Sequence, residues 1–87
     1  MKIKNGFIMR SINNVNVVVP VGEAAGFSAM ITLNGSGAFL WKLLETDTDE
    51  KSLIDAMLEK YDIDENTAKR DVSAFLEKAR NTGIIDE

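Results

Sequence analysis

Residues 33–41 read Leu-Asn-Gly-Ser-Gly-Ala-Phe-Leu-Trp, and they join a strand-like segment to a helical one. Before this run, residues 27–33 place apolar side chains at every second position, which is typical of a strand with one buried face. After it, residues 39–44 carry apolar side chains at helical spacing, and Asn34 or Ser36 can cap that helix by accepting an amide hydrogen bond. The fold is therefore expected to change from strands to helices at this run.

Two further strands are expected upstream. Residues 7–12 and 15–19 are rich in β-branched and other apolar side chains. Asn13 and Asn14 between them tolerate the positive φ of a tight hairpin turn. Pro20 lacks an N–H, so it closes the second strand or places it at a sheet edge.

Two further helices are expected downstream. Residues 46–48 are expected to open the second helix, with acidic residues in its first turn, and residues 62–64 to end it. Asp64 is a good N-cap for the third helix, and Gly83 is placed to adopt the left-handed conformation that ends it, before a short extended tail at 84–85. The apolar stripes are Leu53, Ile54, Met57, Leu58 and Tyr61 in the second helix, and Ala68, Val72, Phe75, Leu76 and Ala79 in the third.

Strands followed by helices indicate an α+β fold, because alternating α/β folds interleave the two. The simplest arrangement is winged-helix-like, with a three-stranded antiparallel sheet followed by a three-helix cluster. The 87 residues are expected to form a single domain, 1–87, with a thin core. The residues expected in that core are Leu33, Phe39, Leu40, Trp41, Val72 and Leu76.

Composition removes the usual catalytic and metal-binding groups. The chain has no histidine and no cysteine, which excludes a thiolate metal site, a cysteine nucleophile and a histidine base. We therefore expect no catalytic residue, no metal and no cofactor. No run approaches the ~20 apolar residues of a membrane span, and the N-terminus lacks the apolar segment of a secretory signal. A cytoplasmic protein without membrane contact is expected.

The net charge of −4 is unevenly distributed. Residues 1–44 carry four basic side chains and one acidic, a net +3, whereas residues 45–87 carry six basic and thirteen acidic, a net −7. In a winged helix, the third helix would enter a DNA groove. Its four basic side chains are balanced by four acidic ones over 64–80, whereas DNA-binding faces are usually strongly basic. DNA binding is kept as an alternative, and no nucleic-acid partner is expected.

Two motifs at helix starts allow a binding or a structural interpretation. Gly35-Ser36-Gly37 could bind an anion, but no phosphate-loop motif surrounds it, and helix capping is favoured. The acidic clusters near residues 47–50 and 62–65 could suggest a cation site. Both lie where acidic residues cap helices and complement the helix dipole, so the structural interpretation is favoured.

Residues 27–33 would form an edge strand if the sheet follows chain order. They contain no charge and no proline, so they lack the usual protection of an edge. A peptide could add as a fourth strand between this edge and the third helix. Alternatively, the third helix or the C-terminal tail covers the edge, and the residues alone leave both possibilities open.

The pattern Leu33-Asn34-x-Ser36-Gly37-x-x-Leu40-Trp41 resembles the core motif of the PqqD-like family, named after a protein of pyrroloquinoline quinone biosynthesis. The resemblance covers about residues 5–86. Its further matches are Leu43-Leu44, Lys60-Tyr61-Asp62, Asp71-Val72, Phe75-Leu76 and Gly83-Ile84-Ile85.

This resemblance implies a non-enzymatic peptide-recognition domain. PqqD-like proteins act as recognition elements for ribosomally synthesised, modified peptides. They bind the leader segment of a precursor peptide and present its core to a modifying enzyme. That enzyme is commonly a radical S-adenosylmethionine protein, or a leader peptidase in lasso-peptide pathways. The leader is expected to add to the third strand and to lie against the third helix.

The candidate site follows from that arrangement. The backbone of Ala29, Met30, Ile31, Thr32 and Leu33 is expected to supply the pairing groups. The core stripe of the third helix has two flanks, Asp71, Ala74, Phe75 and Lys78 on one side, and Lys69, Ser73, Leu76 and Arg80 on the other. The sequence does not determine which flank faces the strand. We favour the first, because Ala74 and Phe75 would form an apolar pocket with polar ends; alternatively, Phe75 is purely core.

Three functional hypotheses follow: a leader-peptide binder, a winged-helix DNA-binding regulator, and a subunit that an enzyme requires but that carries no catalytic group. The expected partners are a precursor peptide and a peptide-modifying enzyme. A monomer or weak homodimer is expected, since an exposed edge strand can pair with its own copy.

Overall fold

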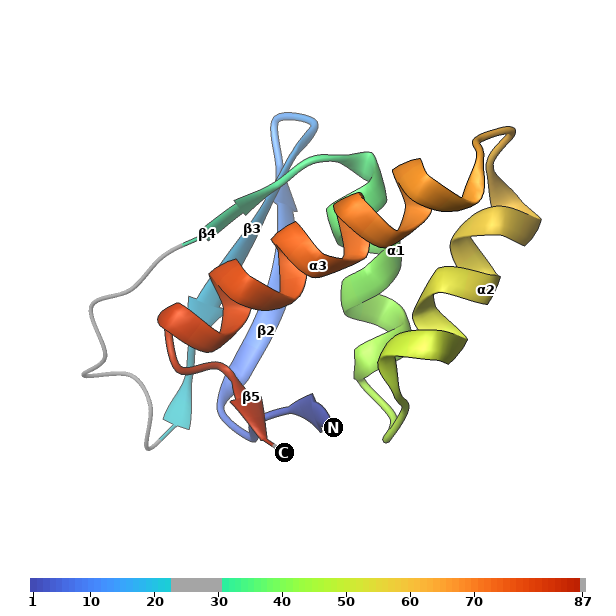
Figure 1. The fold of residues 1–87 in the computed structure, drawn as a ribbon. Helices are drawn as coiled ribbons and strands as arrows, with labels where there is room; N and C mark the ends of the chain where they lie inside the picture. The colour runs from blue at the N-terminus through green and yellow to red at the C-terminus, as the bar shows by residue number, and fades with distance from the viewer. Residues whose placement is uncertain (23–30, 87) are drawn as a thin grey trace.

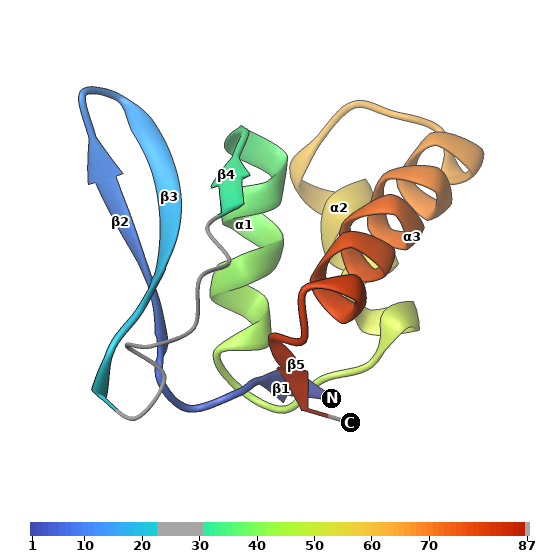
Figure 2. The same cartoon turned by 90° about the vertical axis from the view of Figure 1, so that its left-hand side faces the viewer.

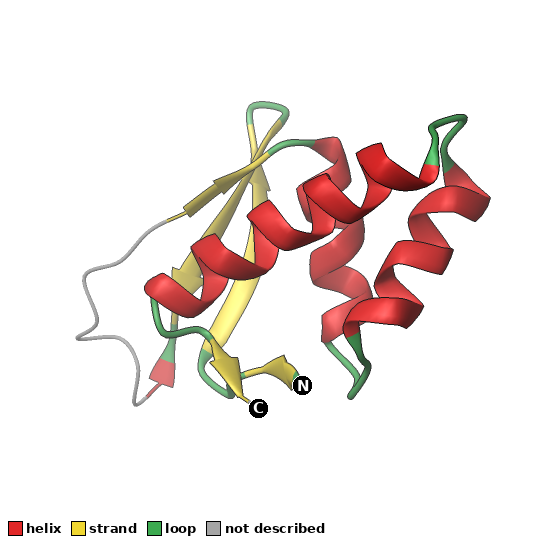
Figure 3. Cartoon of the chain, viewed as in Figure 1, coloured by secondary structure: helices red, strands yellow, loops and turns green. Residues whose placement is uncertain are grey.

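A computed structural model describes residues 1–22 and 31–86 and shows strands followed by helices (Figures 1 and 3). The elements in chain order are β1 (Lys2–Ile3), β2 (Phe7–Ile12), β3 (Val15–Pro20), β4 (Ile31–Leu33), α1 (Gly35–Leu44), α2 (Glu50–Lys60), α3 (Glu65–Asn81) and β5 (Ile85–Asp86). The α+β class is confirmed, with a three-stranded antiparallel sheet followed by three helices.

The three-stranded sheet has the order β2-β3-β4 and both of its pairings are antiparallel. Asn13 and Asn14 turn the β2–β3 hairpin at φ values of 51° and 66°, as the tight turn requires. Pro20 is the last residue of β3, opposite Phe7, where its missing N–H ends the strand. The hairpin expected from the sequence is therefore confirmed.

The described part of β4, Ile31–Leu33, is the end of the strand expected at 27–33. It pairs Leu33 with Asn16 and Ile31 with Val18. Residues 27–30 lie outside the described part of the chain. Within the described residues, β4 forms one edge of the sheet, as chain order implies.

The helices α1 and α3 begin at the caps expected from the sequence. The Asn34 side chain accepts the N–H of Gly37 at 2.8 Å, and the Asp64 side chain accepts the N–H of Thr67 at 2.7 Å. Gly83 follows α3 with a φ of 77°, as expected for the residue that ends this helix. Local capping chemistry thus sets these three boundaries.

The expected start of α2 at 46–48 is wrong, because the helix begins at Glu50, two residues after that range. Asp49 is the N-cap and accepts the N–H of Ser52 at 2.7 Å. The backbone just before Asp49 is hydrogen-bonded to the N-terminus, since Thr48 donates its N–H to the carbonyl of Met1 at 2.9 Å. Asp47 also accepts a hydrogen bond from the N-terminal amine at 2.7 Å. These contacts hold residues 47 and 48 against the N-terminus, and α2 begins after Asp49.

A second sheet of two strands joins the ends of the chain and was not expected. Lys2 pairs with Asp86 and Ile3 with Ile85, and the N–H of Lys4 donates to the carbonyl of Ile84 at 2.9 Å. Figures 1 and 2 both show the two termini side by side beneath α3. The extended tail expected at 84–85 thus becomes a paired strand at Ile85–Asp86.

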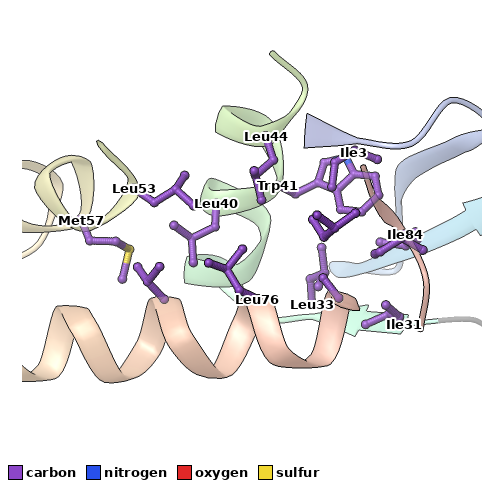
Figure 4. Close-up of a cluster of buried hydrophobic side chains, with 14 of the residues drawn as sticks. Ile3, Ile31, Leu33, Leu40, Trp41, Leu44, Leu53, Met57, Leu76 and Ile84 are labelled. Atoms are coloured by element: carbon purple, nitrogen blue, oxygen red, sulfur yellow. The ribbon is translucent and has the colours of Figure 1, made fainter. Parts of the chain in front are cut away.

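The core lies where α1 and α3 meet β4 and the β1–β5 pair (Figure 4). Five of the six expected core residues, Leu33, Leu40, Trp41, Val72 and Leu76, are buried. Phe39 is wrong in part, since it packs against the core from outside, edge-on to the ring of Tyr61 at 5.8 Å between centroids. The side of α1 that faces the core carries Gly37, Leu40, Trp41 and Leu44, and Trp41 is only 2% exposed. Phe39 lies outside this buried stripe.

No helix in the described ranges 1–22 and 31–86 is long and apolar enough to cross a membrane.

Candidate functional site

An open groove of about 650 Å³ lies between the edge strand β4 and the helix α3. The start of α1 and the tip of the β2–β3 hairpin complete it. Its lining residues are Asn14 and Val15 from the hairpin, Thr32 and Leu33 from β4, Asn34, Ser36, Gly37 and Leu40 around the start of α1, and Asp71, Ala74, Phe75 and Lys78 from α3. Figure 2 shows β4 between the hairpin and the helical layer.

The β4 wall offers backbone rather than large side chains. Ile31 and Leu33 are 4% and 7% exposed and contribute to the core, whereas Thr32 between them is exposed. This alternation follows from the two-residue period of a strand. Because β4 is an edge, backbone groups on its side away from β3 lack a ladder partner among the described residues. Ala29 and Met30, expected in the same site, lie outside the described residues.

The α3 wall is the first of the two flanks considered from the sequence. Asp71, Ala74, Phe75 and Lys78 follow the spacing i, i+3, i+4 and i+7, which places them on one helix face, and all four line the groove. The other flank is engaged elsewhere, since Ser73 donates its hydroxyl to Glu50 of α2 at 3.3 Å. The structure thus places the favoured flank opposite Thr32 and Leu33.

Phe75 has a double position in this wall. It is half-buried, packs against the core cluster and also lines the groove, so it is not purely core. Leu76, the next residue, is fully buried. Two consecutive residues of α3 therefore provide a groove contact and a core contact.

Sequence reasoning missed the contribution of the hairpin tip and of the start of α1. Asn14 and Val15 reach the groove because β3 pairs with β4 so that Asn16 lies opposite Leu33, next to the α1 cap. Val15 is 43% exposed and stands across the hairpin from Ile12, which is 54% exposed. The antiparallel hairpin itself was the available signal, since it fixes which end of β4 its tip adjoins.

The two charged groups that line the groove, Asp71 and Lys78, lie on α3. Within residues 1–22 and 31–86, the one ion pair of Asp71 is with its neighbour Arg70, at a long 3.9 Å between Oδ1 and Nε, and its side chain is 40% exposed. Lys78 is exposed and forms no ion pair within the described residues. The groove therefore combines an apolar centre with one group of each charge.

Capping accounts for the acidic and glycine-rich motifs. Asn34 Oδ1 accepts both the Ser36 hydroxyl at 3.1 Å and the Gly37 N–H, so the Gly-Ser-Gly run serves the cap. The Ser52 N–H and then its hydroxyl lower the pKa of Asp49, and the Thr67 hydroxyl and then its N–H lower the pKa of Asp64. The hydrogen bond from the N-terminal amine lowers the pKa of Asp47. Among the described residues, no three carboxylates gather closely enough to hold a metal ion.

The fold and groove define a winged-helix-like α+β domain with an edge strand facing a helix. A family model described as coenzyme PQQ synthesis protein D (PqqD) matches residues 16–85. Because this match covers most of the chain, the chain belongs to the PqqD family. A search of curated proteins returns no significant match.

Two solved structures share the fold. One is described as TbiB1 in complex with the TbiA(beta) leader peptide, with 26% identity and a TM-score of 0.73 over 99% of this chain and 100% of that chain. The other is described as lasso peptide synthetase B1 complexed with the leader peptide, with 13% identity and a TM-score of 0.75 over 95% and 93% of the two chains. The second likeness concerns the fold alone.

Proposed function

We propose that this protein is a non-catalytic recognition domain that binds the leader segment of a ribosomally made precursor peptide. It presents the core of that peptide to a modifying enzyme, such as a radical S-adenosylmethionine protein. The observation that carries the proposal is the groove between the edge strand β4 and α3, in a chain of the PqqD family. The related TbiB1 is described in complex with a leader peptide.

Binding would occur by strand addition. In this proposal the backbone of β4, together with that of Ala29 and Met30, which lie outside the described residues, supplies hydrogen bonds that do not depend on sequence. The flank of Asp71, Ala74, Phe75 and Lys78 supplies the opposite wall, with the phenyl ring as the apolar anchor. An extended peptide can bind to this edge and wall because its backbone pairs with β4 as a fourth strand of the sheet.

The DNA-binding alternative gains no support from the described residues. One face of α3 faces β4 across the groove, and Lys69 pairs with Glu65 at 3.3 Å while Arg70 lies beside Asp71. The four basic side chains over residues 64–80 are matched by four acidic ones, so this helix lacks the strongly basic face that DNA binding uses. A cytoplasmic location stays a prediction.

The test is a titration of the isotope-labelled protein with a synthetic leader. The leader is taken from a short precursor reading frame encoded beside a modifying-enzyme gene near the gene for this protein. Amide shifts should concentrate in residues 31–33 and 71–78 and saturate. Shifts scattered over all elements, or none at all, would contradict the proposal. Salt-sensitive binding of a DNA duplex instead would favour the regulator.

Two half-buried phenylalanines provide matched variants. Phe75→Ala removes the ring that lines the groove, whereas Phe39→Ala removes a ring that packs on Tyr61 away from it. Loss of an apolar anchor should weaken leader binding by roughly 5- to 30-fold, a cost of about 1–2 kcal/mol. Calorimetry should show this loss for Phe75→Ala and near wild-type affinity for Phe39→Ala. Equal losses would place the peptide elsewhere.

The presenting role has its own measurement. The modifying enzyme should process the full precursor faster with this protein than without it, and should lose that gain with Phe75→Ala. A reaction that proceeds equally well without the protein would contradict the presenting role, even if the leader binds.

A further inference from the structure

We infer that the groove selects a peptide strand with a basic residue, an apolar residue two positions later and an acidic residue two positions after that. This inference rests on the proposed function and specifies the peptide by its charge order.

The first support is the position of the two charged groups. Asp71 and Lys78 lie two helical turns apart on one face of α3, about 10.5 Å along the axis, with Ala74 and Phe75 between them. Within the described residues, Asp71 has only a long ion pair of 3.9 Å with the exposed Arg70, and Lys78 has no ion pair. A bound strand can therefore satisfy both.

The second support is direction. In Figure 1, β4 runs from the grey segment toward α1, whereas α3 runs back the opposite way; Figure 2 shows the same opposition. All strand pairings in the described residues are antiparallel. A strand added antiparallel to β4 thus runs in the same sense as α3 and passes Asp71 before Lys78. Its basic residue must precede its acidic one.

The third support is spacing. Residues i, i+2 and i+4 of a strand point to one face, and four steps cover about 13 Å. Asp71 and Lys78 are about 10.5 Å apart along the α3 axis, and the long, flexible lysine side chain can cover the difference from the 13 Å of the strand. The middle residue then lies over Phe75.

The test is a selection from a displayed library of random ten-residue peptides on the full-length protein. Three proteins are compared: the wild type, the charge-swapped Asp71→Lys/Lys78→Asp, and the control Lys51→Asp/Asp55→Lys. The control swaps an exposed ion pair of 3.3 Å on α2, outside the groove, and all three proteins keep the same net charge. Selected peptides are then synthesised with their two charges in either order, and their dissociation constants are measured at low and high salt.

The wild type and the control should prefer the order basic then acidic by roughly tenfold, since each partly exposed pair contributes up to about fivefold. The charge-swapped protein should prefer the reverse order, and both preferences should shrink at 1 M salt. The single variant Lys78→Glu, at an exposed position, should alone remove the selection for an acidic residue and covers the case in which the double variant does not fold.

The outcomes separate this inference from the proposed function. Peptides that bind the wild type, lose affinity with Phe75→Ala and show no charge order would overturn the inference and leave the proposed function standing. The same order on all three proteins would also overturn it. A library that enriches no peptide on any of them would overturn both.

Discussion

The absence of a side chain at Gly37 allows the end of β4 and the start of α1 to pack closely. A Cβ at this position would lie 3.1 Å from Asn34 Oδ1 and 3.4 Å from two carbons of Leu33. The glycine therefore allows the α1 cap and the end of β4 to pack together beneath the groove. Gly35, in the same turn, has nothing within 4 Å of such an atom. Two glycines of one motif thus have different environments.

This contrast gives a matched prediction. Gly35→Ala should stabilise the protein by a few tenths of a kcal/mol up to about 1 kcal/mol, because alanine favours the helix and restricts the unfolded chain. Gly37→Ala should be destabilising instead, since the cap oxygen must shift and loss of a good N-cap costs about 1 kcal/mol. Urea unfolding of both variants measures the difference. Equal stabilisation by the two alanines would show that the close contact at Gly37 has no energetic consequence.

Helix starts are the feature that joins residue chemistry to whole elements. Asp49 and Asp64 each accept a first-turn N–H, at 2.7 Å in both cases. Hydrogen bonds lower the pKa of both carboxyl groups, from the Ser52 N–H and then its hydroxyl to Asp49, and from the Thr67 hydroxyl and then its N–H to Asp64. A carboxyl whose pKa is lower in the folded than in the unfolded state binds fewer protons when folded. It therefore stabilises the fold above its unfolded pKa, near 4, and loses that contribution as the pH falls through its folded value.

The corresponding prediction concerns the melting temperature between pH 7 and pH 2. The variant Asp49→Asn/Asp64→Asn keeps an oxygen acceptor at both caps but cannot titrate there. The wild type should melt higher than this variant at pH 7, and the difference should shrink as the pH falls below about 5. Glu59→Gln, an exposed carboxyl in the last turn of α2, controls for lost negative charge. A difference that stays constant down to pH 2 would contradict the capping role.

Local signals explain which elements the sequence could predict. Asn13 and Asn14 indicated the hairpin, and Asn34, Asp64 and Gly83 indicated helix ends, because each acts within a few residues. The features that sequence reasoning missed depend on contacts across the chain. The start of α2 is delayed by Met1, and the β1–β5 pair joins residues more than eighty positions apart.

The candidate site follows the same division. The helical period placed Asp71, Ala74, Phe75 and Lys78 on one flank, but the tertiary packing of α3 decides which flank lines the groove. The opposite flank faces α2, where Ser73 donates to Glu50. Asn14 and Val15 enter the groove because the whole hairpin docks beside β4. That these residues bind a peptide stays a proposal, as does the inclusion of Ala29 and Met30.

At the scale of the molecule, one buried cluster connects the strands with the helices. It contains Ile3 and Ile85 from the terminal strands, Leu33 from the sheet, and Trp41 and Leu76 from the helices. Its continuity supports the prediction that residues 1–87 form a single domain. It also means that the groove walls, β4 and α3, are held in place by the same core, so their separation depends on global stability.

Ile84 tests that cooperativity. This side chain is 2% exposed, and its carbonyl accepts the Lys4 N–H that joins the chain ends. Ile84→Ala should cost about 2–5 kcal/mol through the cavity it leaves, which corresponds to a fall of roughly 4–8 °C in melting temperature per kcal/mol. Lys2→Ala, at an exposed position of the same strand pair, should change stability by less than about 0.5 kcal/mol.

Two probes of unfolding test whether the protein is one cooperative unit. Trp41 fluorescence reports on the core and far-ultraviolet circular dichroism on the helices, so one cooperative unit requires both midpoints to move together. A variant that shifts only one of the two transitions would instead show that the core around Trp41 and the helices do not unfold as one unit.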